Sequence, residues 1–81
     1  MALSEIPVGT SAVVASLELP HDIRDHLMHL GFLPEATIDV LRRAPAGDPT
    51  VYRVEGAEIA LRQETARHIR VRPHDSNRDQ V

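Results

Sequence analysis

The chain contains no cysteine, no lysine and no tryptophan, and these absences narrow the kinds of protein that it can be. Without cysteine, neither disulfide bonds nor a cysteine-ligated metal can reinforce the fold. The large aromatic side chains are limited to Phe32 and Tyr52, too few for the aromatic groove with which many domains bind proline-rich peptides. The fold must therefore be held together by packing alone.

Long apolar runs and the usual catalytic signatures are missing too. The longest apolar runs fall far short of the ~20 residues that a membrane-spanning helix needs, and the N-terminus lacks the pattern of a signal peptide. There is no glycine-rich phosphate loop or nucleophile elbow, and no base follows the few serine and threonine residues at a recognisable spacing. We therefore expect a cytoplasmic protein that is not an enzyme and does not insert into a membrane.

The charge is nearly balanced, with twelve acidic and nine basic side chains in 81 residues. The basic residues, all arginine, are neither in excess nor collected on one predicted element. Nucleic-acid binding depends on such an excess, so it is not expected as the primary role. A chain of this length forms one domain around a single small core.

Hydrophobic patterning predicts five short strands, at residues 10–17, 37–43, 50–55, 58–61 and 69–72. A helix is predicted between Pro20 and Gly31, with Ile23, Leu27 and Leu30 on a single stripe facing the core. A polar helical turn at 62–68 links the last two strands.

These elements fit a mainly β fold, a small antiparallel barrel that closes on itself and so removes its exposed edges. The domain is expected to span residues 1–72. Residues 73–81 are rich in polar and charged side chains and are expected to form a flexible tail.

Three segments in order, LMHLGFLP at 27–34, VLRRAPAGDP at 40–49 and IALR at 59–62, followed by Ala66 and the strand at 69–71, together resemble the FeoA family. The resemblance covers roughly residues 3–71. Two positions depart from the family pattern, because Glu35 stands where glycine is usual and Ala46 where leucine is usual. A residue other than glycine at φ > 0 is uncommon, so the first departure concerns the geometry of a turn.

The resemblance implies an SH3-like barrel, a type of domain that also occurs at the C-terminus of DtxR-like regulators. It further implies a cytosolic accessory protein that binds the cytosolic region of FeoB, the ferrous iron permease, and modulates Fe²⁺ transport, with nucleotide hydrolysis left to the permease. No helix-turn-helix segment precedes the domain here, so a repressor function is not expected. Whether such a subunit activates, gates or assembles the transporter stays open.

Exposed apolar and proline-containing loops are the expected partner contacts. The candidate residues are Phe32, Leu33, Pro45, Gly47, Asp48, Pro49, Tyr52 and Arg62. For Gly47 and Asp48 a purely structural role in a strand connection is the alternative. For Arg62 the alternative to a carboxylate contact is a solvated or internally paired side chain.

Metal binding is a weaker hypothesis that rests on the helix histidines. Asp22, His26 and His29 fall on one flank of the helix, but Asp22 and His29 are about two turns, ~10 Å, apart. No metal site and no cofactor are therefore expected. Two alternative functions stay open: a metal-responsive domain that binds Fe²⁺ or Zn²⁺ weakly through these side chains, and an SH3-like adaptor for another regulatory partner. A homo-oligomer formed through an uncovered strand edge is a further alternative.

Overall fold

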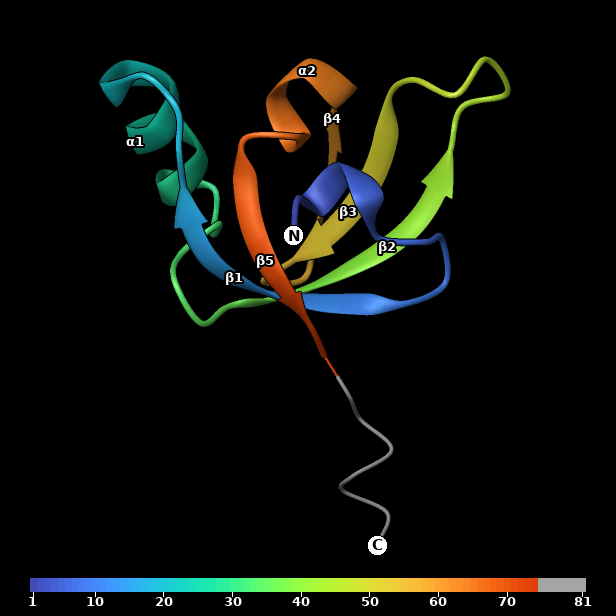
Figure 1. Cartoon of the computed structure of the whole chain (residues 1–81), viewed down its shortest axis with the longest axis horizontal. Helices are drawn as coiled ribbons and strands as arrows, with labels where there is room; N and C mark the ends of the chain where they lie inside the picture. The colour runs from blue at the N-terminus through green and yellow to red at the C-terminus, as the bar shows by residue number, and fades with distance from the viewer. Residues whose placement is uncertain (75–81) are drawn as a thin grey trace, which may run out of the picture.

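The computed structural model describes residues 1–74 of the chain. A short 3₁₀ helix, η1, precedes a five-stranded antiparallel sheet, and two helices connect strands of the sheet (Figure 1). In chain order the elements are η1 (Leu3–Glu5), β1 (Ser11–Leu17), α1 (His21–His29), β2 (Thr37–Arg43), β3 (Thr50–Val54), β4 (Ala57–Leu61), α2 (Gln63–Ala66) and β5 (Ile69–Pro73). The predicted strands and helix are confirmed to within one or two residues at each boundary.

The strands follow the spatial order β4-β3-β2-β1-β5, and every neighbouring pair is antiparallel. The sheet bends strongly around its own inner face (Figure 1). The expected full closure is wrong, because within residues 1–74 no ladder joins the two edge strands, β4 and β5. The four-residue helix α2 connects these edges instead, and the isolated bridge between Ala2 and Arg70 adds a contact on the outer side of β5.

The core lies on the inner face of the bent sheet. Alternation along β3 buries Thr50, Tyr52 and Val54 and leaves Arg53 in solvent, as a half-buried strand requires. The sequence patterning overlooked two core residues in the N-terminal segment, Leu3 and Ile6. The remaining large members of the cluster come from every major element: Val14, Leu17, Leu27, Phe32, Ile38, Val40, Leu61, Ile69 and Val71.

Helix α1 lies at one end of the sheet, and only part of its predicted apolar stripe reaches the core. Leu27 is buried and Leu30, the C-cap residue, is partly buried against the core. Ile23, one turn before Leu27, is 43% exposed, so its expected place in the core is wrong. The physical reason is position: the first turn of α1 projects beyond the sheet, whereas its C-terminal end approaches the inner face (Figure 1).

The turn between α1 and β2 contains two residues with positive φ. Gly31 has φ +117°, and a Cβ there would lie 2.9 Å from Cγ of Glu55, so only glycine fits this close approach. Glu35 has φ +73°, so the turn keeps the backbone geometry usual for glycine although the residue is glutamate.

The C-terminal boundary differs slightly from the expected one. Pro73 belongs to β5, opposite Ala12, and the backbone N–H of His74 donates to the carbonyl of Ser11 at 3.1 Å. The described fold therefore continues past residue 72. The predicted flexibility of the tail concerns residues that otherwise lie outside the described part of the chain.

Candidate functional site

The loop between β2 and β3, residues 44–49, is tied down at both of its ends. The N–H of Ala44 donates to the carbonyl of Pro49 at 2.9 Å, and the N–H of Gly47 donates to the carbonyl of Ala44 at 2.7 Å. Pro45 and Ala46 form the exposed tip. Of the predicted contacts in this loop, Pro45 is therefore the one that is exposed to solvent.

Gly47 and Asp48 connect this loop to helix α2. The Oδ1 of Asp48 accepts a hydrogen bond from the backbone N–H of Gln63 at 3.0 Å, which satisfies a free donor at the start of α2. The side-chain Nε2 of Gln63 donates to the carbonyl of Gly47 at 3.5 Å. The structural alternative for Gly47 and Asp48 therefore has direct support, and half-buried Pro49 continues the same connection into β3.

Two of the predicted contact residues lie inside the protein. Phe32 and Tyr52 are both fully buried, so the expectation that they present exposed surface is wrong. The reason is that the chain has few large apolar side chains, so both aromatic residues are needed to fill the core.

The hydroxyl of Tyr52 has no hydrogen-bond partner within residues 1–74. Burial raises the pKa of this hydroxyl above its ordinary value, and the neighbouring Thr50 and Arg43 offset part of the rise. Asp48 adds a smaller contribution that raises the pKa further.

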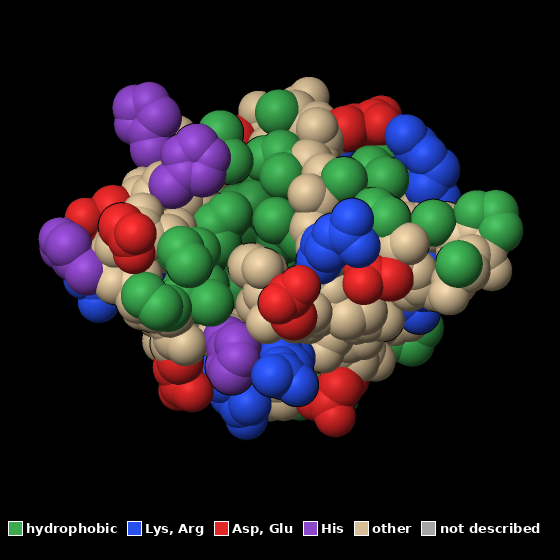
Figure 2. Space-filling model, turned by 90° about the horizontal axis from the view of Figure 1, so that it is seen from above, with side chains coloured by type: hydrophobic (Ala, Val, Ile, Leu, Met, Phe, Trp, Pro, Cys, Tyr) green, Lys and Arg blue, Asp and Glu red, His purple; other side chains and the backbone are tan. Residues whose placement is uncertain are grey.

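The exposed apolar surface consists of other residues. Leu33 is 45% exposed, as predicted for a contact, and Ile23 on α1 is equally accessible. Figure 2 shows one face on which hydrophobic side chains gather near the centre, with histidine, acidic and basic side chains around them. Sequence periodicity missed Ile23 as a surface residue, because a helical stripe does not say where the helix ends relative to the sheet.

Charged side chains on the outer side of the sheet are mostly paired. Nη2 of Arg42 lies 2.9 Å from the carboxylate of Glu58, which also faces Arg53 at 3.8 Å. Arg43, on the other face of β2, donates from Nε to the hydroxyl of Thr50 at 2.8 Å. Arg62 is exposed, and its side chain makes no hydrogen bond or ion pair in the part of the chain that the structure describes.

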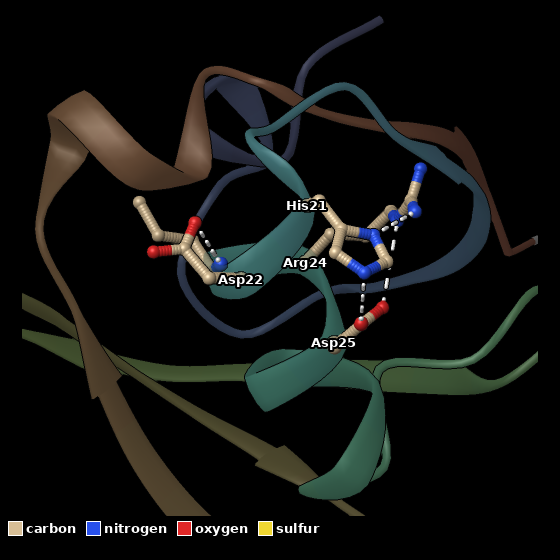
Figure 3. A network of polar contacts seen from close by, with 5 residues as sticks. His21, Asp22, Arg24 and Asp25 are labelled. Atoms are coloured by element: carbon tan, nitrogen blue, oxygen red, sulfur yellow. Dashed lines mark hydrogen bonds and ion pairs between the residues drawn. The ribbon is translucent and has the colours of Figure 1, made fainter.

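Of the helix histidines, His21 takes part in a polar network that differs from the metal group predicted from the sequence. The Nε2 of His21 lies 3.0 Å from Oδ2 of Asp25, and its Nδ1 lies 2.9 Å from Nη2 of Arg24 (Figure 3). Nε of Arg24 also lies 3.8 Å from Oδ1 of Asp25. The spacing i, i+4 of His21 and Asp25 was the available signal for this contact.

The alternative metal group, Asp22 with His26 and His29, is not assembled. Asp22 instead turns its Oδ1 to the N–H of Ile23 at 2.9 Å. Within residues 1–74, no three His, Asp or Glu side chains converge in a way that could hold a metal ion.

A groove of about 400 Å³ lies between β1 and α1. Its lining combines the end of β1, one side of α1 and the following turn: Ala15, Ser16, Leu17, Arg24, Asp25, Met28 and Pro34. No sequence pattern indicated this groove, because it depends on where the pairing of β1 with β2 stops, at Val13 and Thr37. Neither helix among the described residues has the length and apolar character to cross a bilayer.

The fold identifies the chain as a small SH3-like β domain. It superposes on FeoA of Stenotrophomonas maltophilia, described as a prokaryotic SH3 domain protein and solved in complex with zinc, with a TM-score of 0.76, 35% identity and 88% coverage of each chain. It also matches the solution structure of FeoA from Chlorobium tepidum, with a TM-score of 0.89 and 36% identity over 94% of this chain and 72% of that one.

The sequence profile of the FeoA domain family matches residues 1–73, and the chain belongs to that family. A curated relative from Porphyromonas gingivalis is a fusion of Fe(2+) transport protein A with the Fe(2+) transporter FeoB. It is 36% identical over 77 residues, which are 95% of this chain but only 9% of the relative. The expected kinship and fold class are thus confirmed, and the family is a transport-associated one that is not known for catalysis.

Proposed function

We propose that this protein is an accessory subunit of ferrous iron uptake that binds the cytosolic region of a FeoB-like permease and modulates Fe²⁺ transport from the cytoplasmic side. The fusion protein of P. gingivalis carries the proposal, since there a related domain and a FeoB transporter share one polypeptide. Covalent linkage holds two parts at high effective concentration, which is useful when they work in contact.

The segment between β1 and β2 is the favoured docking surface. It carries two large exposed aliphatic side chains, Ile23 on α1 and Leu33 in the following turn. Single exposed apolar residues are common on protein surfaces, but two within one connection provide the kind of anchor on which interfaces depend. Pro45, at the tip of the β2–β3 loop, is the second candidate contact.

Calorimetry with a purified, full-length FeoB-like permease in detergent tests the proposal. We expect micromolar binding that weakens at least tenfold, equivalent to about 1.4 kcal/mol, when Ile23→Ser and Leu33→Ser are combined. Val8→Ser is the matched control, because Val8 is 44% exposed but lies between η1 and β1. Absence of binding at these concentrations would refute the proposed partner, and equal losses in both variants would refute the proposed surface.

Iron uptake in cells tests the modulating role separately. Deletion of the gene should lower the rate of Fe²⁺ accumulation, and the wild-type chain should restore it, whereas the double variant should not. Restoration by the double variant would show that Fe²⁺ transport does not depend on this surface.

A further inference from the structure

Among the described residues, the last three residues of β1, 15–17, have no neighbouring strand on the side where the earlier part of β1 pairs with β2. β1 pairs with β2 through Ser11, Ala12 and Val13 only. The N–H and C=O of Val14 are then taken by Ala36 and Glu35, at 2.9 and 2.8 Å. Beyond this point β1 continues to pair with β5 on its other side, through Ser16 and Leu17. In the described chain no bridge is formed by residues 15–17 on the side where β2 began.

This open stretch forms one wall of the groove described above. A strand without a neighbour presents unpaired backbone N–H and C=O groups, which are a template for another strand. In Figure 1 the end of β1 lies at the margin of the sheet, next to α1 and the α1–β2 turn. The groove therefore lies where β2 would run if it began several residues earlier and paired with the whole of β1.

The opposite wall has apolar and charged parts. Met28 and Pro34 supply apolar surface, and Arg24 and Asp25 supply one charge of each sign. The carboxylate of Asp25 is shared by His21 and Arg24 (Figure 3). The guanidinium of Arg24 has five donors, of which Nη2 lies 2.9 Å from Nδ1 of His21 and Nε lies 3.8 Å from Asp25, so other donors remain for a ligand. A carboxylate from a ligand makes a stronger, charge-assisted bond than this imidazole does.

We propose that the groove binds an extended peptide segment of a partner protein, which adds as a strand to residues 15–17 of β1 and places an acidic side chain against Arg24. Three residues of an added strand cover ~10 Å, and alternate side chains of such a strand point to the same wall, toward Met28 and Pro34. Main-chain hydrogen bonds supply affinity in this mode of recognition, and the wall residues supply selectivity.

β4, one of the two edge strands of the sheet, is a poorer receptor. β4 pairs with β3 along its whole length, and it carries the exposed Glu58, whose carboxylate forms an ion pair with Arg42. Exposed charges on an edge strand discourage further pairing. The open end of β1, by contrast, is enclosed by a helix and a turn, so a bound strand there would bury side chains as well as pair its backbone.

A peptide titration of the full ¹⁵N-labelled chain tests the inference by NMR, independently of any permease. The probe is a capped hexapeptide of alternating valine and threonine with one central aspartate. We expect saturable shifts of backbone amides at residues 15–17, 24 and 28. The same peptide N-methylated at alternate positions should bind at least tenfold more weakly, because it has lost its donors along one edge.

Arg24→Gln should weaken the probe about tenfold, and replacing the aspartate of the probe by asparagine should produce a similar loss. Because both changes remove one contact, their combination should cost little more than either alone. Arg53→Gln is the matched control, an exposed arginine of the outer sheet face, and should leave binding unchanged.

The inference would be overturned by the absence of a saturable shift, by equal binding of the N-methylated probe, or by shifts centred on β4. Shifts at residues 15–17 that grow with the concentration of the protein alone would identify a second copy as the occupant and would also overturn it. Additive losses in the double-change experiment would reject the contact between Arg24 and the acidic side chain.

Discussion

Glu35 and Arg72 join the turn before β2 to the last strand, although 37 positions separate them in the sequence. The guanidinium of Arg72 donates two hydrogen bonds to the carboxylate of Glu35, from Nη1 to Oε2 at 3.2 Å and from Nη2 to Oε1 at 2.5 Å. Glu35 occupies a backbone conformation that favours glycine, with φ +73°. The side chain thus supplies a bidentate contact that glycine could not make, which offsets the conformational cost of placing glutamate there.

Stability should depend on the charge of Glu35. Its hydrogen bonds and ion pair with Arg72 lower the pKa of the Glu35 carboxyl below its ordinary value. The unfolded chain therefore binds a proton first as the pH falls, so the contribution is present at neutral pH and is lost as the pH drops through the folded-state pKa. Glu35→Gln should lower the urea midpoint slightly at neutral pH and in low salt, and the difference from the wild type should vanish in acid.

Glu55→Gln is the control for this prediction. Glu55 also has a positive φ, +52°, but its carboxylate forms no ion pair within residues 1–74. The two variants should separate only at neutral pH. An equal effect of both would show that the loss of a carboxylate charge in general, and not the contact with Arg72, lowers the stability.

Two aliphatic residues of α1 should respond very differently to truncation. Leu27→Ala removes a buried side chain from the core and should cost roughly 2–5 kcal/mol, a large share of the stability of so small a domain. Ile23→Ala, one turn earlier, should change the free energy of unfolding by only about 0.5 kcal/mol because the side chain is largely exposed. Chemical denaturation of both variants measures the difference, and comparable losses would mean that Ile23 packs in the folded protein.

Asp48 should stabilise helix α2 from a distant loop. Asp48→Ala removes the acceptor for the N–H of Gln63 and should cost about 0.5–2 kcal/mol, the usual range for losing a helix cap. Asp48→Asn retains a side-chain oxygen and should keep most of that stability. Hydrogen exchange of the Gln63 amide provides a local readout: it should accelerate in the alanine variant only.

The ionisation of Tyr52 can be followed without interference, because it is the single tyrosine and there is no tryptophan. Burial raises the pKa of its hydroxyl, so the unfolded chain loses that proton first as the pH rises. Stability should therefore fall above the ordinary pKa of tyrosine, about 10. Near-ultraviolet absorbance should show tyrosinate appearing at a higher pH in the folded protein than in the chain unfolded by urea.

Tyr52→Phe should weaken this alkaline dependence. At neutral pH it should change stability by no more than about 1 kcal/mol, because the buried hydroxyl has no hydrogen-bond partner among the described residues. Tyrosinate formation in the native protein at the ordinary pKa would contradict the burial of Tyr52.

The strands were predictable because their local signals agree. In β2 and β3, alternation, β-branched residues and flanking prolines all favour the same assignment, and both boundaries at residues 37 and 50 match. The N-terminal segment was not predictable in this way. Leu3 and Ile6 lie in a short 3₁₀ turn without strand or helix periodicity, and they are buried only because η1 packs beside β5.

The candidate site was less predictable than the fold. Phe32 and Tyr52 were predicted as contacts in exposed apolar loops, but large apolar side chains are the ones that a small core needs, and both are buried. The loop residues Asp48 and Gly47 accept hydrogen bonds from Gln63 of α2, and no local sequence pattern indicates a contact between this loop and that helix. Leu33 and Pro45 were the predicted apolar contacts that the fold leaves exposed.

The order and type of the elements were settled by the sequence itself, since periodicity, turn residues and the glycine at 31 act over a few neighbouring positions. Which apolar residues are buried, which carboxylates meet which arginines, and where the sheet stays open were decided only by the tertiary structure. These properties depend on contacts between residues far apart in the chain, such as Glu35 with Arg72, and such contacts exist only after the sheet has bent around its core.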